Sequence, residues 1–352
     1  MTSRAVNLAI FAIVLAEFAS GVFSLLGGTL WVRPDGAWLF WTHRIGGLAL
    51  AVLLAWKWRI VLRSYQRHGL TLMTALAALL TTLFLLTLVS GSAWATVGFP
   101  GLRLPGIGGL TGLGVHILLA LLLVPFFVVH AVHRWPRVLR PDFASRRAAL
   151  RYAGLGAAGL TLWQGHEKLT SAANLSGTQR RFTGSRERGS FSGNGYPTTN
   201  WLSDTRQQID PAAWSLRVHG LVARDLELSL RDLQANPTVT TRAILDCTGG
   251  WFTEQDWQGV PLTAILAGAQ PEDAARSILV TSATGYRRRF PLSEAGTLLL
   301  GVHASGAALS PGHGAPVRLI APGHRGFNWV KWVTEIEVSD LPAWLQSPLP
   351  LQ

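Results

Sequence analysis

The sequence contains a single cysteine, few charged residues, and fewer acidic than basic ones. Cys247 stands alone among 352 residues, so no disulfide within the chain can form in any cellular compartment. Charged residues make up only 14% of the chain, yet 31 Lys and Arg against 19 Asp and Glu leave a net charge of +12. The basic residues lie in short clusters between long apolar runs, which is typical of membrane topology signals rather than of nucleic-acid binding. The composition therefore predicts a membrane protein that binds no nucleic acid.

Five apolar runs fill the first half of the chain. Four of them span residues 6–27, 37–56, 70–93 and 113–132, and a shorter fifth run at 148–163 is rich in Gly and Ala. A helix of about 20 apolar residues crosses the hydrocarbon layer of a membrane. We therefore expect an all-α bundle of transmembrane helices over residues 1–135, followed by a basic loop and a fifth transmembrane helix over 136–165.

The basic residues between the runs predict the orientation. The loops after the second and fourth runs are basic, whereas the two alternate loops carry only Arg33 and Arg103. Because basic loops stay in the cytoplasm, we expect a cytoplasmic N-terminus and a C-terminal half on the outer, periplasmic or extracellular side of the cell membrane. Arg146 and Arg147 before the fifth run resemble an internal twin-arginine export signal, although paired arginines are also common at cytoplasmic helix ends.

Two histidines near the outer ends of apolar runs are candidate haem ligands. His43 lies in the second run and His116 at the start of the fourth. Ligand side chains inside membrane helices are usually functional, and two facing neutral imidazoles suit the iron of a b-type haem. We therefore expect His43 and His116 to bind an outer haem.

An inner haem would need His130 and a partner. His130 follows His116 by 14 residues and returns to nearly the same helix face. The second run offers Lys57 at the matching spacing, so His68 is the remaining candidate partner; alternatively, His130 is an interfacial side chain. The placement of two histidines on one helix resembles the bacterial cytochrome b561-like membrane subunits.

The second half of the chain has the character of a soluble domain. Residues 166–197 are rich in Gly, Ser, Arg and Asn and predict a linker or arm. Residues 198–345 contain short β-type segments separated by turns, for example at 214–219, 240–245, 277–282 and 316–321. Short helices are expected near 229–235 and 262–269. This mixture predicts an α+β domain over residues 198–345.

Three stretches of this domain combine a thiol, glycines and basic side chains. In residues 246–251, Asp-Cys-Thr-Gly-Gly-Trp, two glycines near the thiol would let a large ligand approach the backbone. Residues 313–318 and 323–332 interleave glycines with basic residues, which is typical of a phosphate cradle. Taken singly, each basic residue would be a surface charge and Cys247 a small buried hydrophobe.

Together and in this order, the stretches resemble the molybdopterin-binding domain of the sulfite oxidase family, over about residues 191–340. The resemblance implies that the Cys247 thiolate is the molybdenum ligand, which suits a soft thiolate. It also implies a set of residues that bind the pterin and its phosphate: Asn194, Ser282, His313, Arg318, Arg325 and Lys331.

Departures from the family pattern favour one branch of it. Sulfite oxidases carry an arginine and a histidine in the arm where this chain has Gly193 and Gly195, and Ala-Gly-Asn-Arg-Arg after the cysteine where this chain has Thr-Gly-Gly-Trp. Losing these arginines removes the charge-assisted bonds that an oxyanion needs. The Cys-x-x-x-Trp spacing and the pattern Trp257-x-Gly259 are similar to those of the catalytic subunits of periplasmic methionine sulfoxide reductases.

These observations predict a membrane-bound molybdenum oxidoreductase that transfers oxygen atoms. We expect it to reduce an S-oxide or N-oxide with electrons from membrane quinol, passed through b-type haem to molybdenum. Two alternatives stay open: a sulfite-type dehydrogenase that passes electrons to quinone, and a cofactor-free membrane-anchored binding protein. No acid–base residue is assigned, because the candidates are expected to be structural or surface groups: Asp246, Glu254, Asp256 and His324.

Overall fold

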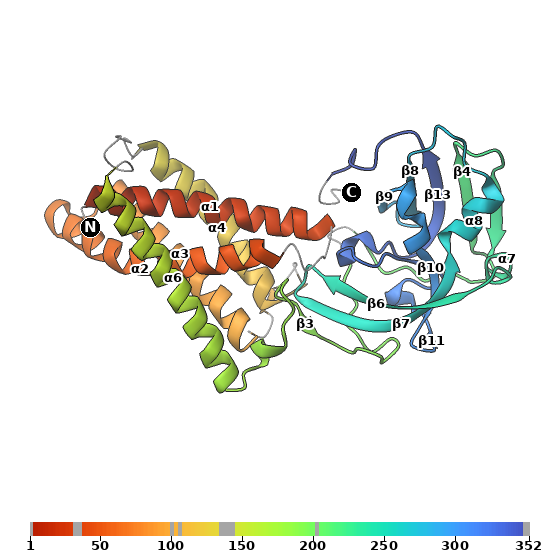
Figure 1. Cartoon of the computed structure of the whole chain (residues 1–352), viewed down its shortest axis with the longest axis horizontal. Coiled ribbons are helices and arrows are strands. Elements are labelled where there is room, and N and C mark those ends of the chain that lie inside the picture. Colours follow the sequence, from red (N-terminus) through yellow and green to blue (C-terminus); the bar gives the residue numbers. More distant parts are fainter. Residues whose placement is uncertain are drawn as a thin grey trace. The chain divides into compact units, whose positions relative to one another are not determined.

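A computed structural model describes residues 3–30, 37–98, 102–104, 108–133, 145–200 and 204–347 of the chain. The chain folds into two compact units (Figure 1). The first, here called the helical unit, is built mainly from residues up to Arg186, and the second, the sheet unit, mainly from Glu187 onward. The predicted linker at 166–197 is therefore divided between the units, and its first part belongs to the helices.

Five long helices make up the described part of the helical unit: α1 (Ser3–Leu30), α2 (Ala37–His68), α3 (Leu72–Thr96), α4 (Gly112–His133) and α6 (Arg146–Ala172). A hairpin of β1 (Leu102–Leu104) and β2 (Gly108–Leu110) lies between α3 and α4, and the 3₁₀ turn η2 (Ser176–Gln179) follows α6. Four helices are long and apolar enough to cross a membrane, over Val6–Ser24, Ala37–Arg67, Leu72–Thr96 and Gly112–His133. These four coincide with the first four predicted runs.

The helices bury a narrow apolar core and expose an apolar surface. Leu54 of α2 and Leu83 of α3 are buried between the helices. Outward-facing side chains are also apolar, and Val89 and Leu121 are 64% and 58% exposed. Water would disfavour such an extended apolar surface, whereas lipid tails would cover it. The four helices are thus compatible with a membrane-anchored protein.

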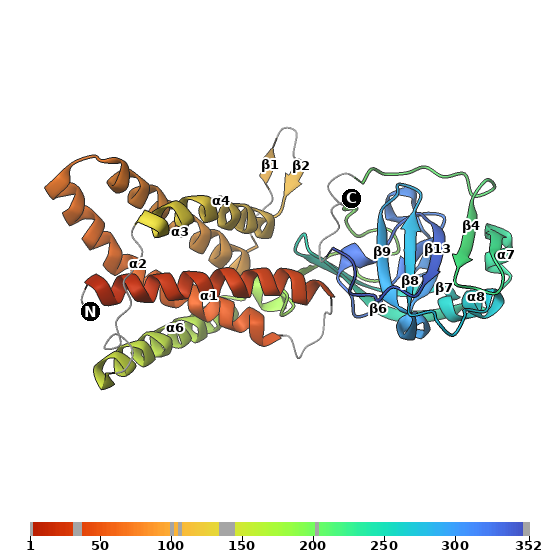
Figure 2. The ribbon, with the colours of Figure 1, turned by 90° about the horizontal axis from the view of Figure 1, so that it is seen from above.

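Helix α6 ends at Ala172 rather than at residue 165, where the fifth apolar run was expected to finish. Its N-terminus is capped by Ser145, whose Oγ accepts a hydrogen bond from the Ala148 N–H at 3.1 Å. The helix packs closely on α2, because a Cβ on Gly159 would lie 2.7 Å from the Ile45 carbonyl oxygen (Figure 2). It is not among the helices apolar enough to cross a membrane, so a fifth crossing stays a prediction.

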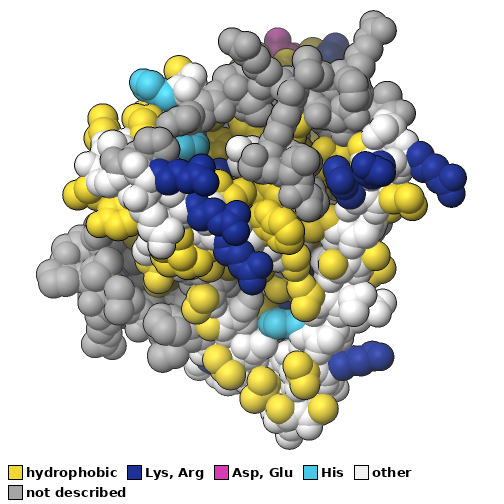
Figure 3. Space-filling model, turned by 90° about the vertical axis from the view of Figure 1, so that its left-hand side faces the viewer, with side chains coloured by type: hydrophobic (Ala, Val, Ile, Leu, Met, Phe, Trp, Pro, Cys, Tyr) yellow, Lys and Arg dark blue, Asp and Glu magenta, His cyan; other side chains and the backbone are white. Residues whose placement is uncertain are grey.

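Basic side chains gather at the end of the helical unit where α2 ends and α6 begins. Figure 3 looks onto this end and shows Lys and Arg side chains among hydrophobic ones. The exposed basic residues here include Arg63 and Arg67 of α2 and Arg146 and Arg147 of α6. A basic end is typical of the cytoplasmic side of a membrane bundle, and the orientation of this chain stays a prediction.

The sheet unit contains two β-sheets. One has the order β11-β10-β7-β3, with β12 paired to β10 and β6 paired to β7, and the other has the order β5-β4-β13-β8-β9. The second sheet is mixed, because β13 runs parallel to β4 and antiparallel to β8. The strands are β3 (Arg186–Glu187), β4 (Ser215–Gly220), β5 (Leu226–Ser229), β6 (Val239–Cys247), β7 (Trp251–Pro261), β8 (Ser277–Ser282), β9 (Arg287–Pro291), β10 (Leu299–Ala304), β11 (Ala307–Ala308), β12 (Arg318–Ile320) and β13 (Val333–Ser339).

Side chains of both sheets share one apolar core, which includes Trp257, Leu300, Ile278 and Ile336. Short helices α7 (Leu230–Gln234) and α8 (Leu262–Ala269) and the 3₁₀ turns η3 (Leu292–Thr297), η4 (Pro311–His313) and η5 (Gly326–Asn328) complete the unit. The strands expected at 240–245 and 277–282 and the helix at 262–269 are present as β6, β8 and α8. The predicted fold class, a helical region followed by an α+β domain, is confirmed.

The hairpin of β6 and β7 positions the single thiol. Cys247 is the last residue of β6 and pairs with Trp251, the first residue of β7. Three residues form the turn between them, and Gly250 has a φ of +89°, a conformation that other residues rarely adopt. Burial alternates along β7, so the side chains of Trp251 and Trp257 face the core. Gly250 thus allows the tight turn that follows the cysteine.

Candidate active site

A cleft in the sheet unit brings together the three stretches singled out in the sequence. It holds about 620 Å³ of space, including its open mouth. Its walls come from the arm, the turn after Cys247 and the segments around η4 and η5, and they include Tyr196, Thr199, Asn200, Asp204, Cys247, Trp251, Tyr286, His313, Arg318, Gly326, Trp329 and Lys331.

The Cys247 thiol lies in this cleft and is 9% exposed. The Gly249 N–H donates a hydrogen bond to its Sγ at 3.3 Å. Burial raises the pKa of Cys247, while this N–H and the nearby Arg325 act in the opposite direction. A bound metal cation would favour the thiolate instead. The thiol is therefore held in place for a ligand rather than activated as a free nucleophile.

A buried ion pair lies next to Cys247, on the residue that precedes it in β6. Arg325 Nη1 donates to Asp246 Oδ1 at 2.5 Å, and the two side chains are 7% and 1% exposed. Gly326 follows, and a Cβ there would lie 3.2 Å from the Cys247 Cα. The pair thus fixes η5 against the end of β6. Arg325 was predicted to bind the cofactor. In the structure its guanidinium pairs with Asp246, and neither residue is among those that line the cleft.

Lys331 supplies a positive charge to the cleft. Its Nζ donates to the Thr199 carbonyl at 3.1 Å, to Asn200 Oδ1 at 2.7 Å and to the Gly312 carbonyl at 2.9 Å. Burial, and next the charge of Arg318, lowers the pKa of Lys331 to about 7. Within the described residues no carboxylate lies within 4.0 Å of this ammonium group. The Asp204 carboxylate of the same cleft acts on this half-buried ammonium group from beyond 4.0 Å, and an anionic ligand such as a phosphate would be a closer partner.

Arg318 is also buried, at 1% exposure, and lies against two indole rings. Its guanidinium carbon is 5.4 Å from the ring centre of Trp257 and 5.8 Å from that of Trp329. Nη1 donates to the Tyr196 hydroxyl at 3.1 Å and to the His313 carbonyl at 3.0 Å, and Nη2 donates to the Trp329 carbonyl at 3.3 Å. Nε has no partner among the described residues. Arg318 thus anchors the arm to the cleft and keeps one unsatisfied donor.

His313 makes contacts with both ring nitrogens. Nδ1 is 2.7 Å from Ser310 Oγ, and Nε2 is 2.9 Å from the Tyr196 carbonyl oxygen. Burial lowers the pKa of His313 to about 4, so the ring is neutral at pH 7. Its described contacts hold the arm in place, whereas a contact with the pterin stays a prediction.

Two further predicted residues do not line the cleft. Asn194 fastens the arm to the segment after β11, since Nδ2 donates to the Ala308 carbonyl at 2.8 Å and Oδ1 accepts from the Ser310 N–H at 2.9 Å. Ser282 Oγ accepts from the N–H and the hydroxyl of Thr284, at 3.2 and 3.0 Å, in the turn after β8. Both residues shape segments that border the site, and their proposed cofactor contacts remain untested.

Sequence reasoning missed one acidic residue of the cleft. Asp204 lines it, and Oδ1 of its carboxylate is buried without a hydrogen-bond partner among the described residues. Burial raises the pKa of Asp204. The sequence offers no signal for this role, because an Asp in a polar segment is usually a surface group.

In the helical unit, His43 of α2 and His116 of α4 face one another. Their ring centroids are 6.1 Å apart and the ring planes meet at 83°. The Nδ1 atom of His43 is 3.0 Å from Glu17 Oε2, and the Nδ1 atom of His116 is 2.9 Å from the Thr87 carbonyl oxygen. These bonds fix the orientation of each ring and leave the two Nε2 atoms as candidate ligands for a metal. The residues present therefore fit a haem iron between them.

Glu17 is the second residue that the sequence reasoning missed, although a signal existed. It is the only acidic residue in the four long apolar runs, and an ionisable residue in a membrane helix is usually functional. A Cβ at position 46 would overlap the carboxylate of Glu17, so the absence of a side chain at Gly46 lets Glu17 pack against α2. Glu17 thus contacts the Nδ1 side of the His43 ring.

One member of the predicted inner pair lies partly outside the described residues. His130 lies on α4, and His68 ends α2 with a side chain outside the described part of the chain. Lys57, the alternative at this spacing, donates to Asn7 Oδ1 at 2.6 Å. The inner haem and its ligands stay a prediction.

Comparison with known proteins agrees with the site in the sheet unit. Residues 203–344 match the family model described as the oxidoreductase molybdopterin binding domain. Nitrate reductase [NADPH] of Mycosarcoma maydis is 32% identical over 180 residues, which cover 39% of this chain and 18% of the relative. The uncharacterized oxidoreductase YuiH of Bacillus subtilis (strain 168) is 30% identical over 131 residues, covering 36% of this chain and 66% of the relative.

A third relative is the protein-methionine-sulfoxide reductase catalytic subunit MsrP of Gluconobacter oxydans (strain 621H). It is 26% identical over 156 residues, which cover 38% of this chain and 49% of the relative. The chain thus spans less than two thirds of the length of each of these relatives. Residues 203–344, which hold Cys247, Arg318 and Lys331, are thus a molybdopterin-binding oxidoreductase domain by the match to this family model.

Proposed function

We propose that the protein is a membrane-bound molybdenum oxidoreductase that reduces an S-oxide or N-oxide with electrons from membrane quinol, passed through b-type haem. The observation that carries the proposal is the cleft itself. It places the Cys247 thiol and the half-buried Lys331 ammonium in one site, and no carboxylate of the described residues lies within 4.0 Å of the ammonium. A thiolate for a soft metal and a cation for a phosphate are the two groups that a molybdenum–pterin cofactor requires.

The chain's own residues hold and orient the cofactor. Cys247 would bind the metal, and Lys331 with the free Nε of Arg318 would bind the phosphate end. When bound, this cofactor supplies reversible oxygen-atom transfer coupled to two electrons. The ion pair between Arg325 and Asp246 keeps the thiol in position from outside the cleft.

The proposed reaction balances with two electrons and two protons. Quinol is oxidised to quinone and releases both electrons and both protons. The sulfoxide substrate accepts two electrons and two protons, its S–O bond breaks, and the corresponding sulfide and one water molecule leave. For an N-oxide, the N–O bond breaks in the same way, and the amine and water leave.

A neutral substrate fits this site better than an oxyanion does. The two basic side chains that line the cleft, Arg318 and Lys331, already make several bonds to the protein and are assigned to the phosphate. The arm offers no room for another arginine at Gly193, where φ is +64° and a Cβ would lie 2.8 Å from the Ala307 Cβ. Trp251 adds an aromatic wall, which suits the apolar groups of a sulfoxide or amine oxide.

Electrons are proposed to enter through the helical unit. The His43 and His116 rings are held by Glu17 and by the Thr87 carbonyl with both Nε2 atoms available for iron. We propose that quinol in the membrane reduces a haem at this pair. The basic end of the bundle is proposed to face the cytoplasm and the sheet unit the outer side.

The test uses the full-length protein in detergent. Metal analysis should find molybdenum in the wild type and a loss of most of it in Cys247→Ser, while Arg242→Gln on the same strand, whose side chain is 62% exposed, should keep it. A Cys247→Ser protein as active as the wild type would falsify the ligand assignment. Two assays decide the direction of the reaction. The first supplies a quinol analogue with a panel of sulfoxides and N-oxides, and the second supplies sulfite with a quinone analogue. Turnover only in the second assay would replace the proposed reduction by sulfite-type oxidation.

A further inference from the structure

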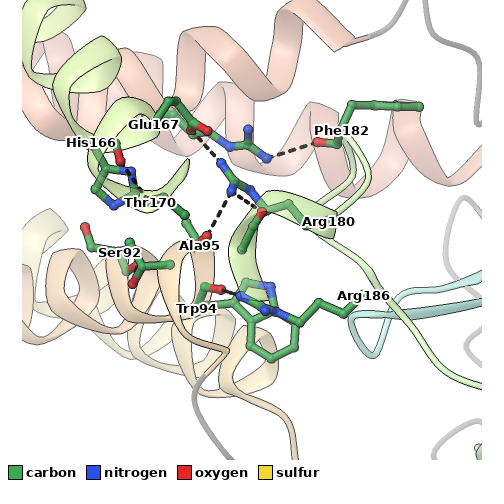
Figure 4. Close-up of polar contacts among 12 residues, drawn as sticks. Ser92, Trp94, Ala95, His166, Glu167, Thr170, Arg180, Phe182 and Arg186 are labelled. Carbon is green, nitrogen blue, oxygen red and sulfur yellow. Dashed lines mark hydrogen bonds and ion pairs between the residues drawn. The ribbon is translucent and has the colours of Figure 1, made fainter. Parts of the chain in front are cut away.

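The polar clusters of the two units differ in whether their charged groups already have partners. In the helical unit, charged side chains gather where α3 and α6 end, and Figure 4 shows how they pair. Arg180 Nη2 donates to Glu167 Oε1 at 2.5 Å, and Arg186 donates to the Trp94 carbonyl. These charged groups have partners within the chain, so this cluster by itself indicates no ligand.

The cleft of the sheet unit, in contrast, contains an acceptor without a donor. Asp204 lines the cleft and is half-buried, and its Oδ1 is buried with no hydrogen-bond partner among the residues that the structure describes. The Thr284 side chain hydrogen-bonds to the same carboxylate, and the Lys331 ammonium acts on it from beyond 4.0 Å. A buried carboxylate oxygen without a donor costs free energy, unless a ligand supplies that donor.

Asp204 is the anionic acceptor that the cleft offers to a ligand. Of the described residues that line the cleft, it alone carries a carboxylate. Neighbouring polar side chains are engaged with the protein. Asn200 Oδ1 accepts from Lys331 at 2.7 Å, the Tyr286 hydroxyl donates to a backbone carbonyl at 2.5 Å, and both ring nitrogens of His313 make contacts. A ligand with N–H donors would therefore find its open acceptor at Asp204.

A molybdopterin carries such donors at one end of its ring system. Its pyrimidinone ring has a ring N–H next to an exocyclic amino group, and a carboxylate can accept from such a pair through two parallel hydrogen bonds. Each carboxylate oxygen has two acceptor positions, so the bond to Thr284 leaves room for these donors. The phosphate of the same cofactor needs cations, which Lys331 and Arg318 supply in the same cleft. One acceptor and two cations would thus hold both ends of the cofactor.

We propose that Asp204 binds the amino edge of the pterin ring and so sets the orientation of the cofactor in the cleft. This inference rests on the proposed binding of a molybdenum–pterin cofactor beside Cys247. Asp204 lies within the residues that match the molybdopterin-binding family model. Its role is to bind and position the ring, while Thr284 holds the carboxylate in place.

The test compares two ligands that differ at the proposed contact. Full-length protein is produced in cells that make no molybdopterin, purified in detergent and titrated with hydroxymethylpterin phosphate or with its lumazine analogue, in which an oxo group replaces the amino group. Ligand fluorescence is the readout. The wild type should bind the pterin at least about tenfold more tightly than the lumazine, because the lumazine lacks one donor to a charged acceptor.

Asp204→Asn should lose most of this preference, because its amide presents a donor where the carboxylate presents an acceptor. Asp204→Glu should retain part of the preference, because it keeps the carboxylate. Asp256→Asn makes the same change on β7, outside the cleft lining, and should leave the preference unchanged. A purely structural effect of Asp204→Asn would weaken the binding of both ligands alike, so the ratio of the two affinities isolates the contact.

An equal preference in the wild type and in Asp204→Asn overturns the inference, and so does a wild type that binds both ligands equally or binds neither. The proposed function is judged separately, on wild-type protein isolated from cells that make the cofactor. Molybdenum and pterin in that protein leave the proposed function standing even where the inference about Asp204 fails. Their absence from it removes the proposed function itself.

Discussion

Arg325 and Asp246 form a buried ion pair at the point where β6 ends in Cys247, with Nη1 and Oδ1 2.5 Å apart. The two residues are 79 positions apart in the chain, and a β-bridge between them joins the segment of η5 to the strand. The pair therefore links the thiol that faces the cleft to the second basic stretch. It makes the position of Cys247 dependent on a contact between two distant parts of the sequence.

Breaking this pair should destabilise the fold more than breaking an exposed pair. Arg325→Gln leaves the Asp246 carboxylate buried without its partner, and such changes typically cost about 3–5 kcal/mol. Thermal unfolding of the full-length protein in detergent should show a marked fall in the transition of the sheet unit. Asp256→Asn breaks the exposed pair between Arg242 and Asp256 and should leave the transition in place. Equal effects of the two changes would contradict the assigned role.

The stability of the cofactor-free protein should rise with pH above neutrality because of Lys331. Burial lowers its pKa to about 7 from an ordinary value of 10.5. Between these values the unfolded chain binds a proton that the folded chain does not, so the free energy of unfolding increases with pH in this window. Lys331→Met should remove this part of the slope in denaturant titrations at pH 6 to 10. A slope that persists unchanged in Lys331→Met would contradict the prediction.

The outer haem should depend on both histidines and, less strongly, on Glu17. His43→Ala or His116→Ala should abolish the low-spin b-type spectrum of purified membranes, because each removes a proposed iron ligand. Glu17→Ala removes the charged partner of His43 Nδ1 and leaves Ser20 Oγ at 3.1 Å, and loss of such a partner typically weakens metal binding about 10- to 100-fold. Glu17→Gln keeps an oxygen acceptor and should retain more haem than Glu17→Ala. An unchanged spectrum in His116→Ala would exclude this pair.

Restoring the arm arginine of sulfite oxidases should not create sulfite oxidation. Gly193 has a φ of +64°, and its Cβ position is 2.8 Å from the Ala307 Cβ, so Gly193→Arg adds backbone strain and overpacking, of about 1–3 kcal/mol each. Gly306→Arg is a control, because Gly306 also has a positive φ of +82° but faces open space. The melting temperature should fall further in Gly193→Arg than in Gly306→Arg. A stable Gly193→Arg protein that oxidises sulfite would show that the arm can adapt.

Hydropathy predicted where the long apolar helices lie, but not how far each one continues. The second apolar run ends at residue 56, whereas α2 continues to His68. Its extension holds Lys57, Arg59 and Arg63, whose straight side chains favour helix and extend into water. The polar residues around Glu167 likewise continue α6 to Ala172. Composition suggested a linker there, whereas in the structure α6 packs against α2 and the following turn η2 packs against α3.

The sequence by itself determined the kinds of groups in this protein. The apolar runs placed His43 and His116 in helices, and the pattern around Cys247 placed a thiol at a strand end beside glycines, because both features depend on local periodicity and spacing. Only the tertiary structure decided how each group is used. Arg318, Arg325 and Lys331 look alike as basic residues in glycine-rich stretches, yet they differ in the folded chain. Arg325 is neutralised by Asp246, and Arg318 is held between indoles. Lys331 lies in the cleft with Asp204 as an acidic neighbour, but no carboxylate of the described residues is within 4.0 Å of its ammonium group. The charge available to a cofactor depends on contacts between residues far apart in the chain, and no local pattern contains that information.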